Sequence, residues 1–220
     1  YETMKTDSSA SNTRKKQEGD YIDSAFNYTF VLNKLDQNFQ PTDGYKSSFS
    51  QSIPLVSEDY TVINAIEYAA YQSFKDDYIF GFNFLFKSAN SLNGEDIRAS
   101  KRLYVPSRRL RGFESGKVGP IDSGDFIGGN YISVVNLSTN LPNLFTEVQN
   151  LDFTIFLDSA NVWGVDFDSS LDSSKIRSST GIAVNWYTPI GPLSFSFAQP
   201  ITKASSDVEE TYRFDIGTTF

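Results

Sequence analysis

The stretch Tyr78-Ile79-Phe80-Gly81-Phe82-Asn83-Phe84-Leu85-Phe86 decides the fold, because every second residue in it, from Tyr78 to Phe86, is aromatic. Side chains of a β-strand point alternately to its two faces, so this period of two indicates a strand with one strongly apolar face. The same alternation recurs clearly at residues 22–32, 151–158, 182–186, 193–198 and 212–217, and more weakly at 44–55, 60–73 and 131–141. Together these segments predict about nine strands and an all-β antiparallel fold.

The composition excludes several kinds of chemistry. The 220 residues include 19 Phe and 12 Tyr but no Cys and no His. Without Cys there is no disulfide framework and no thiolate nucleophile, and without His there is no imidazole base and no His-ligated zinc. The net charge of −8 argues against nucleic acid as a partner, since a face that binds phosphates is basic.

The sequence shows neither a membrane-spanning helix nor a targeting segment. The longest charge-free stretches, residues 126–146 and 178–202, are interrupted by Ser, Thr, Asn, Gly and Pro. A helix buried in lipid needs about 20 mostly apolar residues, so a helical membrane protein is not expected. The first five residues carry no apolar core of a signal peptide, and we expect any secretory signal to have been removed or to lie outside this sequence.

Two all-β architectures fit the alternation. In a soluble sandwich the apolar faces of two sheets pack together, whereas in a transmembrane barrel the apolar face meets lipid and the polar face lines a wet lumen. The barrel is favoured by aromatics near strand ends and by long connections (6–20, 89–127, 164–178) that alternate with short ones (75–77, 187–192). The polar face also holds too many groups for a dry core: Asp23, Asn27, Asn83, Asn185, Arg213 and Asp215. A soluble β-sandwich binding module remains the alternative.

A tripeptide in the longest connection gives the chain a family resemblance. Arg111-Gly112-Phe113 is followed by Gly119-Pro120 and then by Gly128-Gly129-Asn130, which opens a strand. This order resembles the BamA-like outer-membrane barrel-assembly insertases of the bacterial surface antigen family. Three further segments are similar to that family, over residues 21–220 in order: the turn at 33–44, the hairpin at 189–200 and the terminal strand at 212–220.

The resemblance implies an architecture. Such a protein has a barrel of about sixteen strands, preceded by periplasmic peptide-binding repeats. This chain is then the C-terminal part of an antiparallel transmembrane β-barrel in the bacterial outer membrane, with long extracellular loops and short periplasmic turns. Within one partial barrel domain, residues 1–220, we expect three functional segments: a strand stub and extracellular loop at 1–20, a lumen-directed loop at 89–127 and the terminal strand at 211–220.

The resemblance also implies roles for the tripeptide. In the family the loop folds back into the lumen, where its Arg, here Arg111, meets carboxylates of the barrel wall. A confined guanidinium needs such partners, and Asp158 matches one of them. The second expected carboxylate falls at Ser138, a departure that leaves Glu114 or Asp125 as substitutes.

Other residues of the loop have structural roles in this interpretation. Gly112 permits the tight turn, Phe113 supplies an apolar anchor, and Gly128 with Gly129 opens the next strand. A second departure is Val105-Pro106, where relatives often carry a Gly pair. The alternative for Arg111 is a solvated loop cation beside its neighbours Arg108 and Arg109.

The terminal strand is the second candidate site. The resemblance implies a loose seam with the first strand, where a client's strand adds to the edge formed by Tyr212, Phe214, Ile216, Gly217 and Phe220. The implied function is the folding and insertion of outer-membrane β-barrel proteins, with client barrels, assembly-complex lipoproteins and outer-membrane lipid as partners. No bond is made or broken, so we expect no enzyme and no cofactor. A protein-translocation pore of the two-partner secretion type is the alternative function.

One acidic loop invites a metal interpretation. Asp166, Asp168 and Asp172 place carboxylates at short spacing, which suits calcium. Their spacing does not match an EF-hand loop, and loops rich in Asp and Ser are common on cell surfaces. We therefore expect no metal site.

Overall fold

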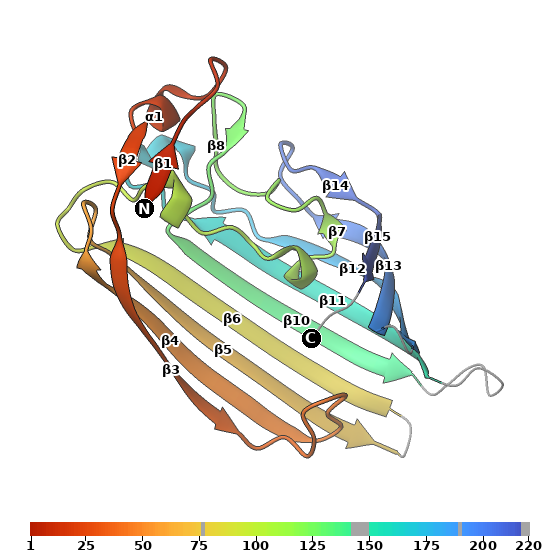
Figure 1. The fold of residues 1–220 in the computed structure, drawn as a ribbon. Helices are drawn as coiled ribbons and strands as arrows, with labels where there is room; N and C mark the ends of the chain where they lie inside the picture. The colour runs from red at the N-terminus through yellow and green to blue at the C-terminus, as the bar shows by residue number, and fades with distance from the viewer. Residues whose placement is uncertain (76–77, 142–149, 189–190, 217–220) are drawn as a thin grey trace.

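The fold is built on one antiparallel sheet (Figure 1). The computed structural model describes residues 1–75, 78–141, 150–188 and 191–216. Nine strands follow one another across the sheet: β3 (Ser24–Asn33), β4 (Gly44–Val56), β5 (Thr61–Phe74), β6 (Tyr78–Ser91), β10 (Tyr131–Leu141), β11 (Leu151–Trp163), β12 (Arg177–Thr188), β13 (Gly191–Thr202) and β15 (Tyr212–Ile216). The predicted all-β antiparallel fold of about nine strands is confirmed.

The strands have the length that a membrane requires. β5 and β6 have 14 residues each and pair from Thr61↔Ser91 to Phe74↔Tyr78. At about 3.3 Å per residue they are longer than the ~30 Å hydrocarbon core, which suits tilted strands that extend beyond it. No helix in the described part of the chain is long and apolar enough to cross a membrane.

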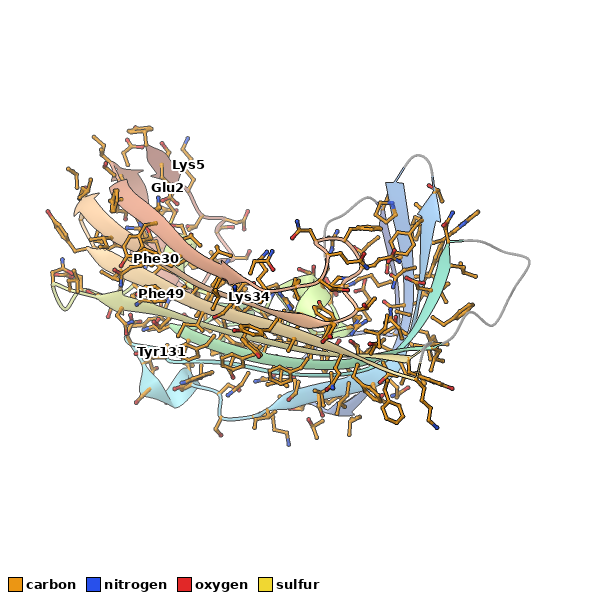
Figure 2. The ribbon with its side chains drawn as sticks, turned by 90° about the horizontal axis from the view of Figure 1, so that it is seen from below. Glu2, Lys5, Phe30, Lys34, Phe49 and Tyr131 are labelled. Atoms are coloured by element: carbon orange, nitrogen blue, oxygen red, sulfur yellow. The ribbon has the colours of Figure 1, made fainter. Side chains whose placement is uncertain are left out.

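The sheet forms a single curved layer with side chains on both faces (Figure 2). Its convex face carries the aromatic and aliphatic rows, and these remain exposed: Phe80 at 51%, Ile155 at 46% and Ile182 at 55%. Among the described residues no second sheet covers them. The β-sandwich alternative is therefore wrong, because a sandwich would bury these rows between its layers.

The concave face has a dry half and a wet half. Towards the end of the sheet where the long connections lie, the inward residues Ile132, Val134, Ala160 and Val162 are apolar and buried. They pack against the connection 92–130, which covers this part of the face and replaces water with apolar contacts. The other half of the face lines a cavity of about 650 Å³ with polar groups that include Asn83, Asn140, Thr154 and Asn185.

Small elements lie at the end with the long connections and over the concave face (Figure 1). They include the strand pairs β1 (Glu2–Met4) with β2 (Gly19–Tyr21), β7 (Gly112–Phe113) with β14 (Glu209–Glu210), and β8 (Ile121–Asp122) with β9 (Asp125–Phe126), the helix α1 (Asn12–Lys15) and the 3₁₀ turns η1 (Ala99–Lys101), η2 (Ser107–Arg109) and η3 (Ser169–Leu171). The expected strand stub at residues 1–4 thus pairs with β2 in a separate hairpin and lies outside the large sheet.

The predicted strand 22–32 begins at Ser24, and Asp23 just before it binds Arg98. Likewise β6 continues to Ser91, so the long inner connection starts three residues later than the predicted position 89.

Candidate functional site: a loop clamped to the concave wall

The connection carrying the Arg-Gly-Phe tripeptide, which we call the lumen loop (residues 92–127), lies against the concave face of the sheet (Figure 1). Its apolar residues Val105, Leu110, Phe113 and Val118 are all buried in one cluster with inward residues of β6, β10 and β11. Phe113 is 1% exposed and is among the largest fully buried side chains of the described residues. Burying a Phe contributes on the order of 2–3 kcal/mol, so this side chain holds the loop on the wall.

Arg111 and Asp158 form a two-pronged ion pair at the centre of this contact. The guanidinium donates from Nε to Oδ2 and from Nη2 to Oδ1, both at 2.8 Å, and the backbone N–H of Arg111 donates to Oδ2 at 3.1 Å. The Asp158 side chain is 0% exposed and that of Arg111 is 19% exposed. The structure therefore places Arg111 against the wall and not in solvent beside Arg108 and Arg109.

Two polar residues of neighbouring strands complete the surroundings of this pair. Asn136 of β10 and Ser179 of β12 lie directly across from Asp158 in the sheet register. Asn136 Nδ2 donates to Asp158 Oδ1 at 2.8 Å and to the Arg109 carbonyl at 2.7 Å, while the Ser179 hydroxyl donates to the Arg111 carbonyl. We call Arg111, Asp158, Asn136 and Ser179 the wall clamp.

An aromatic ring supports the cation of the wall clamp. The Arg111 guanidinium carbon lies 3.3 Å from the centroid of the Phe156 ring. Phe156 is itself buried against Ala183 and Ala198. A guanidinium over a desolvated ring gains on the order of 1–2 kcal/mol. Arg111 is therefore held by the Asp158 carboxylate at the edge of its guanidinium and by the Phe156 ring on the flat face of that group.

The second wall partner expected near Arg111 is an amide instead of a carboxylate. Ser138, at the expected position, lines the open cavity. Of the two substitutes, Asp125 lies 3.8 Å from Arg14 and Glu114 is exposed, with its backbone N–H bonded to the Val208 carbonyl. The second polar wall residue is the amide of Asn136, which sequence reasoning missed because only the strand register places it opposite Asp158.

The flanking cations of the tripeptide bind elsewhere. Arg108 Nε lies 3.7 Å from Asp215 of β15, and Arg109 Nη2 lies 3.4 Å from Glu67 of β5. Both cations are partly exposed. Such pairs contribute about 0–1 kcal/mol, so neither matches the buried pair of the wall clamp.

Two glycines permit backbone contacts that a side chain would block. Gly112 has φ +91°, and a Cβ there would lie 3.2 Å from the Ser179 Cβ and 3.3 Å from the Ala198 Cβ. At Gly129, which follows Gly128 and precedes β10, a Cβ would collide with the backbone of Trp163. Gly129 pairs through both backbone groups with Leu103, which ties the middle of the lumen loop to the start of β10.

The terminal strand lies directly beside the lumen loop. β14 pairs with β7, with Glu209 opposite Phe113 and Glu210 opposite Gly112, and β15 follows two residues later (Figure 1). Outward residues of β15 are Tyr212, Phe214 and Ile216, all exposed. Gly217 and Phe220, the other predicted seam residues, lie outside the described residues, as do Pro189 and Ile190 of the similar hairpin.

A basic segment near the start of the lumen loop forms a second attachment, which the sequence did not reveal. Lys101 Nζ lies 3.1 Å from Asp23 and also contacts Asp59, and Arg98 contacts Asp23. Burial opposes ionisation of Asp23, but hydrogen bonds from Ser57, Lys101 and Arg98 outweigh it and lower its pKa to about 2. A sequence signal for this group is Asp23, a charged residue at the start of the predicted strand 22–32.

The acidic residues considered for calcium are engaged separately. Asp166 binds Arg102 and the backbone N–H of Ile97, and Asp168 caps Ser170 of η3. Asp172 accepts from the backbone N–H of Gly164 at 2.8 Å. Asp166 is thus tied to the lumen loop, while Asp168 and Asp172 bond within their own loop. Among the described residues, no group of three or more acidic side chains could hold a metal ion.

The whole chain, residues 1–220, matches the model of the Omp85 superfamily domain. The chain belongs to the Omp85 superfamily. It is similar to outer membrane protein assembly factor BamA of Neorickettsia risticii, with 25% identity over 212 residues that cover 94% of this chain and 28% of that relative. It is also similar to the factor of the same name in Nitratidesulfovibrio vulgaris, with 25% identity over 98% of this chain and 28% of the relative.

A solved structure agrees with the Omp85 assignment. The crystal structure of BamA from Haemophilus ducreyi lacking POTRA domains 1–3 is similar with a TM-score of 0.79 and 26% identity, over 86% of this chain and 41% of that one. The predicted architecture, the C-terminal part of a BamA-like outer-membrane β-barrel, is confirmed. This Omp85 chain spans less than a third of the length of these two curated relatives.

Proposed function

We propose that this chain is the C-terminal barrel portion of an outer-membrane protein assembly factor, which folds and inserts client β-barrel proteins through a lateral seam at β15. The observation that carries the proposal is the contact between the lumen loop and the terminal strand. The loop that holds Arg111 on the wall through Asp158 also pairs by backbone with β14, immediately before β15. The related assembly factors support the same function for the longer protein.

The mechanism is the addition of a strand to an edge. β15 and β3 form the two edges of the nine-stranded sheet in the described residues. Unpaired N–H and C=O groups of an edge template another strand, and backbone hydrogen bonds supply the affinity. We propose that a client's strand joins at β15, while its apolar face enters lipid beside the outward row of Tyr212, Phe214 and Ile216. No covalent step is needed, so the protein is not an enzyme in this proposal.

The partners follow from this mechanism. Unfolded client barrels supply the strands, and outer-membrane lipid contacts the exposed apolar rows of the convex face. Assembly-complex lipoproteins, which the family resemblance implies, belong to the proposal for the longer protein.

The test measures client folding by the full-length protein in lipid vesicles. A urea-denatured client barrel is added, and its folding is followed by heat-modifiable gel migration. We expect Arg111→Ala to slow client folding at least tenfold, and Arg109→Ala, on the same turn, to leave it within twofold. Full client folding by the Arg111→Ala protein contradicts the role of the wall clamp.

A second measurement addresses the alternative function. Vesicles are tested for both client folding and ion conductance. Conductance without any client folding would indicate a translocation pore and would contradict the proposed insertase.

A further inference from the structure

The inward side of the terminal strand carries a cation that binds the lumen loop. Arg213 Nη2 donates to the Phe113 carbonyl at 2.9 Å, and Nη1 donates to the Ser107 carbonyl. Nε donates to the Glu210 carboxylate at 2.8 Å. The Arg213 side chain is only 11% exposed. Both carbonyls belong to the loop segment that contains Arg111, so one side chain of β15 spans that segment from η2 to β7.

A second contact between the same two segments runs in the opposite direction. Arg108, in the turn η2, lies 3.7 Å from Asp215, the next inward residue of β15 after Arg213. The backbone pairing of β7 with β14 adds two further residue pairs immediately upstream. We call Arg213, Glu210 and the carbonyls of Ser107 and Phe113 the seam latch.

Only an arginine satisfies this geometry. Its planar guanidinium presents donors in several directions at once, which matches two carbonyls and one carboxylate that lie on different segments. A lysine in this position would keep the positive charge, but its ammonium group is compact and lacks the planar, forked arrangement of donors. A glutamine lacks both the charge and the reach.

The segment just before β15 is attached independently of the seam latch. Arg177 of β12 and Asp207 form a buried ion pair, with Nε and Nη2 each donating at 3.0 Å to a different carboxylate oxygen. The backbone N–H of Val208 donates to the Lys117 carbonyl at 3.1 Å. The connection 203–208 therefore stays on the wall when the latch is broken, and the loss of the latch acts on β15 and on the loop segment 107–113.

We propose that Arg213 is a positioning residue that couples the lumen loop to the terminal strand. While the wall clamp holds the loop, Arg213 draws the inward face of β15 against it. When the loop leaves the wall, the two carbonyls move away and β15 is released as the edge that a client joins. This inference rests on the proposed function, since it assigns the control of that same edge to one side chain.

The test is hydrogen–deuterium exchange of the full-length protein without client. Arg213→Gln is compared with the matched control Arg109→Gln, which alters a cation of the same turn that faces Glu67 on β5. We expect Arg213→Gln to raise exchange about tenfold or more in both peptides 107–113 and 209–216, since a charge-assisted contact between them is lost. Arg109→Gln leaves both unchanged, and Arg213→Lys gives an intermediate rise in both.

Two results overturn the inference. One is unchanged exchange in 107–113 when exchange in 209–216 rises, which is the signature of a local structural role. The other is no rise in either peptide. If Arg213→Gln does not fold, as shown by the loss of heat-modifiable migration, Arg213→Lys replaces it. The inference is then overturned if exchange in Arg213→Lys does not rise in both peptides.

Client folding by the same preparations separates the latch from the proposed function. If exchange rises in both peptides of Arg213→Gln and the rate of client folding changes, the seam latch and the proposed function are both supported. If exchange rises in both peptides but the rate of client folding is unchanged, the seam latch is supported and the role of β15 as the client edge is contradicted.

Discussion

Two arginines hold the lumen loop in contrasting ways. Arg111 reaches from the loop to the wall, where Asp158 is 0% exposed and the ion pair is two-pronged. Arg213 reaches from the terminal strand to the loop, where it binds backbone carbonyls and Glu210, whose side chain is 37% exposed. The comparison teaches that burial of the partner carboxylate determines how much free energy is lost when the contact breaks. A desolvated carboxylate cannot be left without its cation, whereas a half-exposed one can turn to water.

The largest expected effect comes from breaking the wall clamp. Arg111→Ala leaves Asp158 buried without its cation, which costs about 3–5 kcal/mol of folding free energy. The measurement is the temperature at which the full-length protein loses heat-modifiable migration, which we expect to fall by many degrees. A melting temperature equal to that of the unaltered protein would show that Asp158 is satisfied without Arg111.

Breaking the seam latch is expected to cost less. Arg213→Gln removes charge-assisted hydrogen bonds but leaves Glu210 free to reach solvent, for a loss of about 1.5–3 kcal/mol. Urea unfolding of the two variants side by side ranks them, and we expect Arg213→Gln to lie between Arg111→Ala and the unaltered protein. If Arg213→Gln is the less stable of the two, the contrast between the contacts is wrong.

Acid provides a test of a third attachment, the contact of Asp23 with Arg98 and Lys101. The folded-state pKa of Asp23 is about 2, below its ordinary value of 3.8, so this carboxylate stabilises the fold fully above pH 3.8. That contribution is lost as the pH falls from 3.8 towards 2. We expect hydrogen–deuterium exchange in peptides around Arg98 and Lys101 to rise over this interval. Asp23→Asn is expected to reduce this acid dependence, with the remainder coming from Asp59, which contacts the same Lys101. An acid dependence of unchanged size in Asp23→Asn would contradict the role of Asp23.

The smallest effect is expected at the exposed pair of Arg109 and Glu67. Arg109→Ala costs about 0–1 kcal/mol, because both side chains already contact solvent. Urea unfolding gives the value directly. A loss comparable to that of Arg111→Ala would mean that position along the loop, and not burial, decides the strength of these contacts.

The sequence allowed parts of the site to be predicted. Arg111 and Asp158 came from the family resemblance, and the inward side of Arg213 came from the alternation in its strand. Asn136 and Ser179 were missed, because their place beside Asp158 depends on how three strands align. The partners of Arg213 were missed for a different reason. Two of them are backbone carbonyls about a hundred positions away, and a carbonyl leaves no mark in a residue pattern.

The concave face is another feature that the sequence predicted only in part. A wet lumen and a loop directed into it were both predicted, but not that this loop would bury the inward residues Ile132 and Val134.

By itself the sequence determined the strands, their two faces and the number of passes, because alternation of apolar and polar residues is a local property of an extended chain. It favoured a barrel over a sandwich, but the sandwich was excluded only by the structure, in which the rows of Phe and Ile remain exposed. Only the tertiary structure decided what lies against the concave wall and which segment the terminal strand is tied to. Those contacts join residues far apart in the chain, and they are selected by burial and strand register, which no single segment contains.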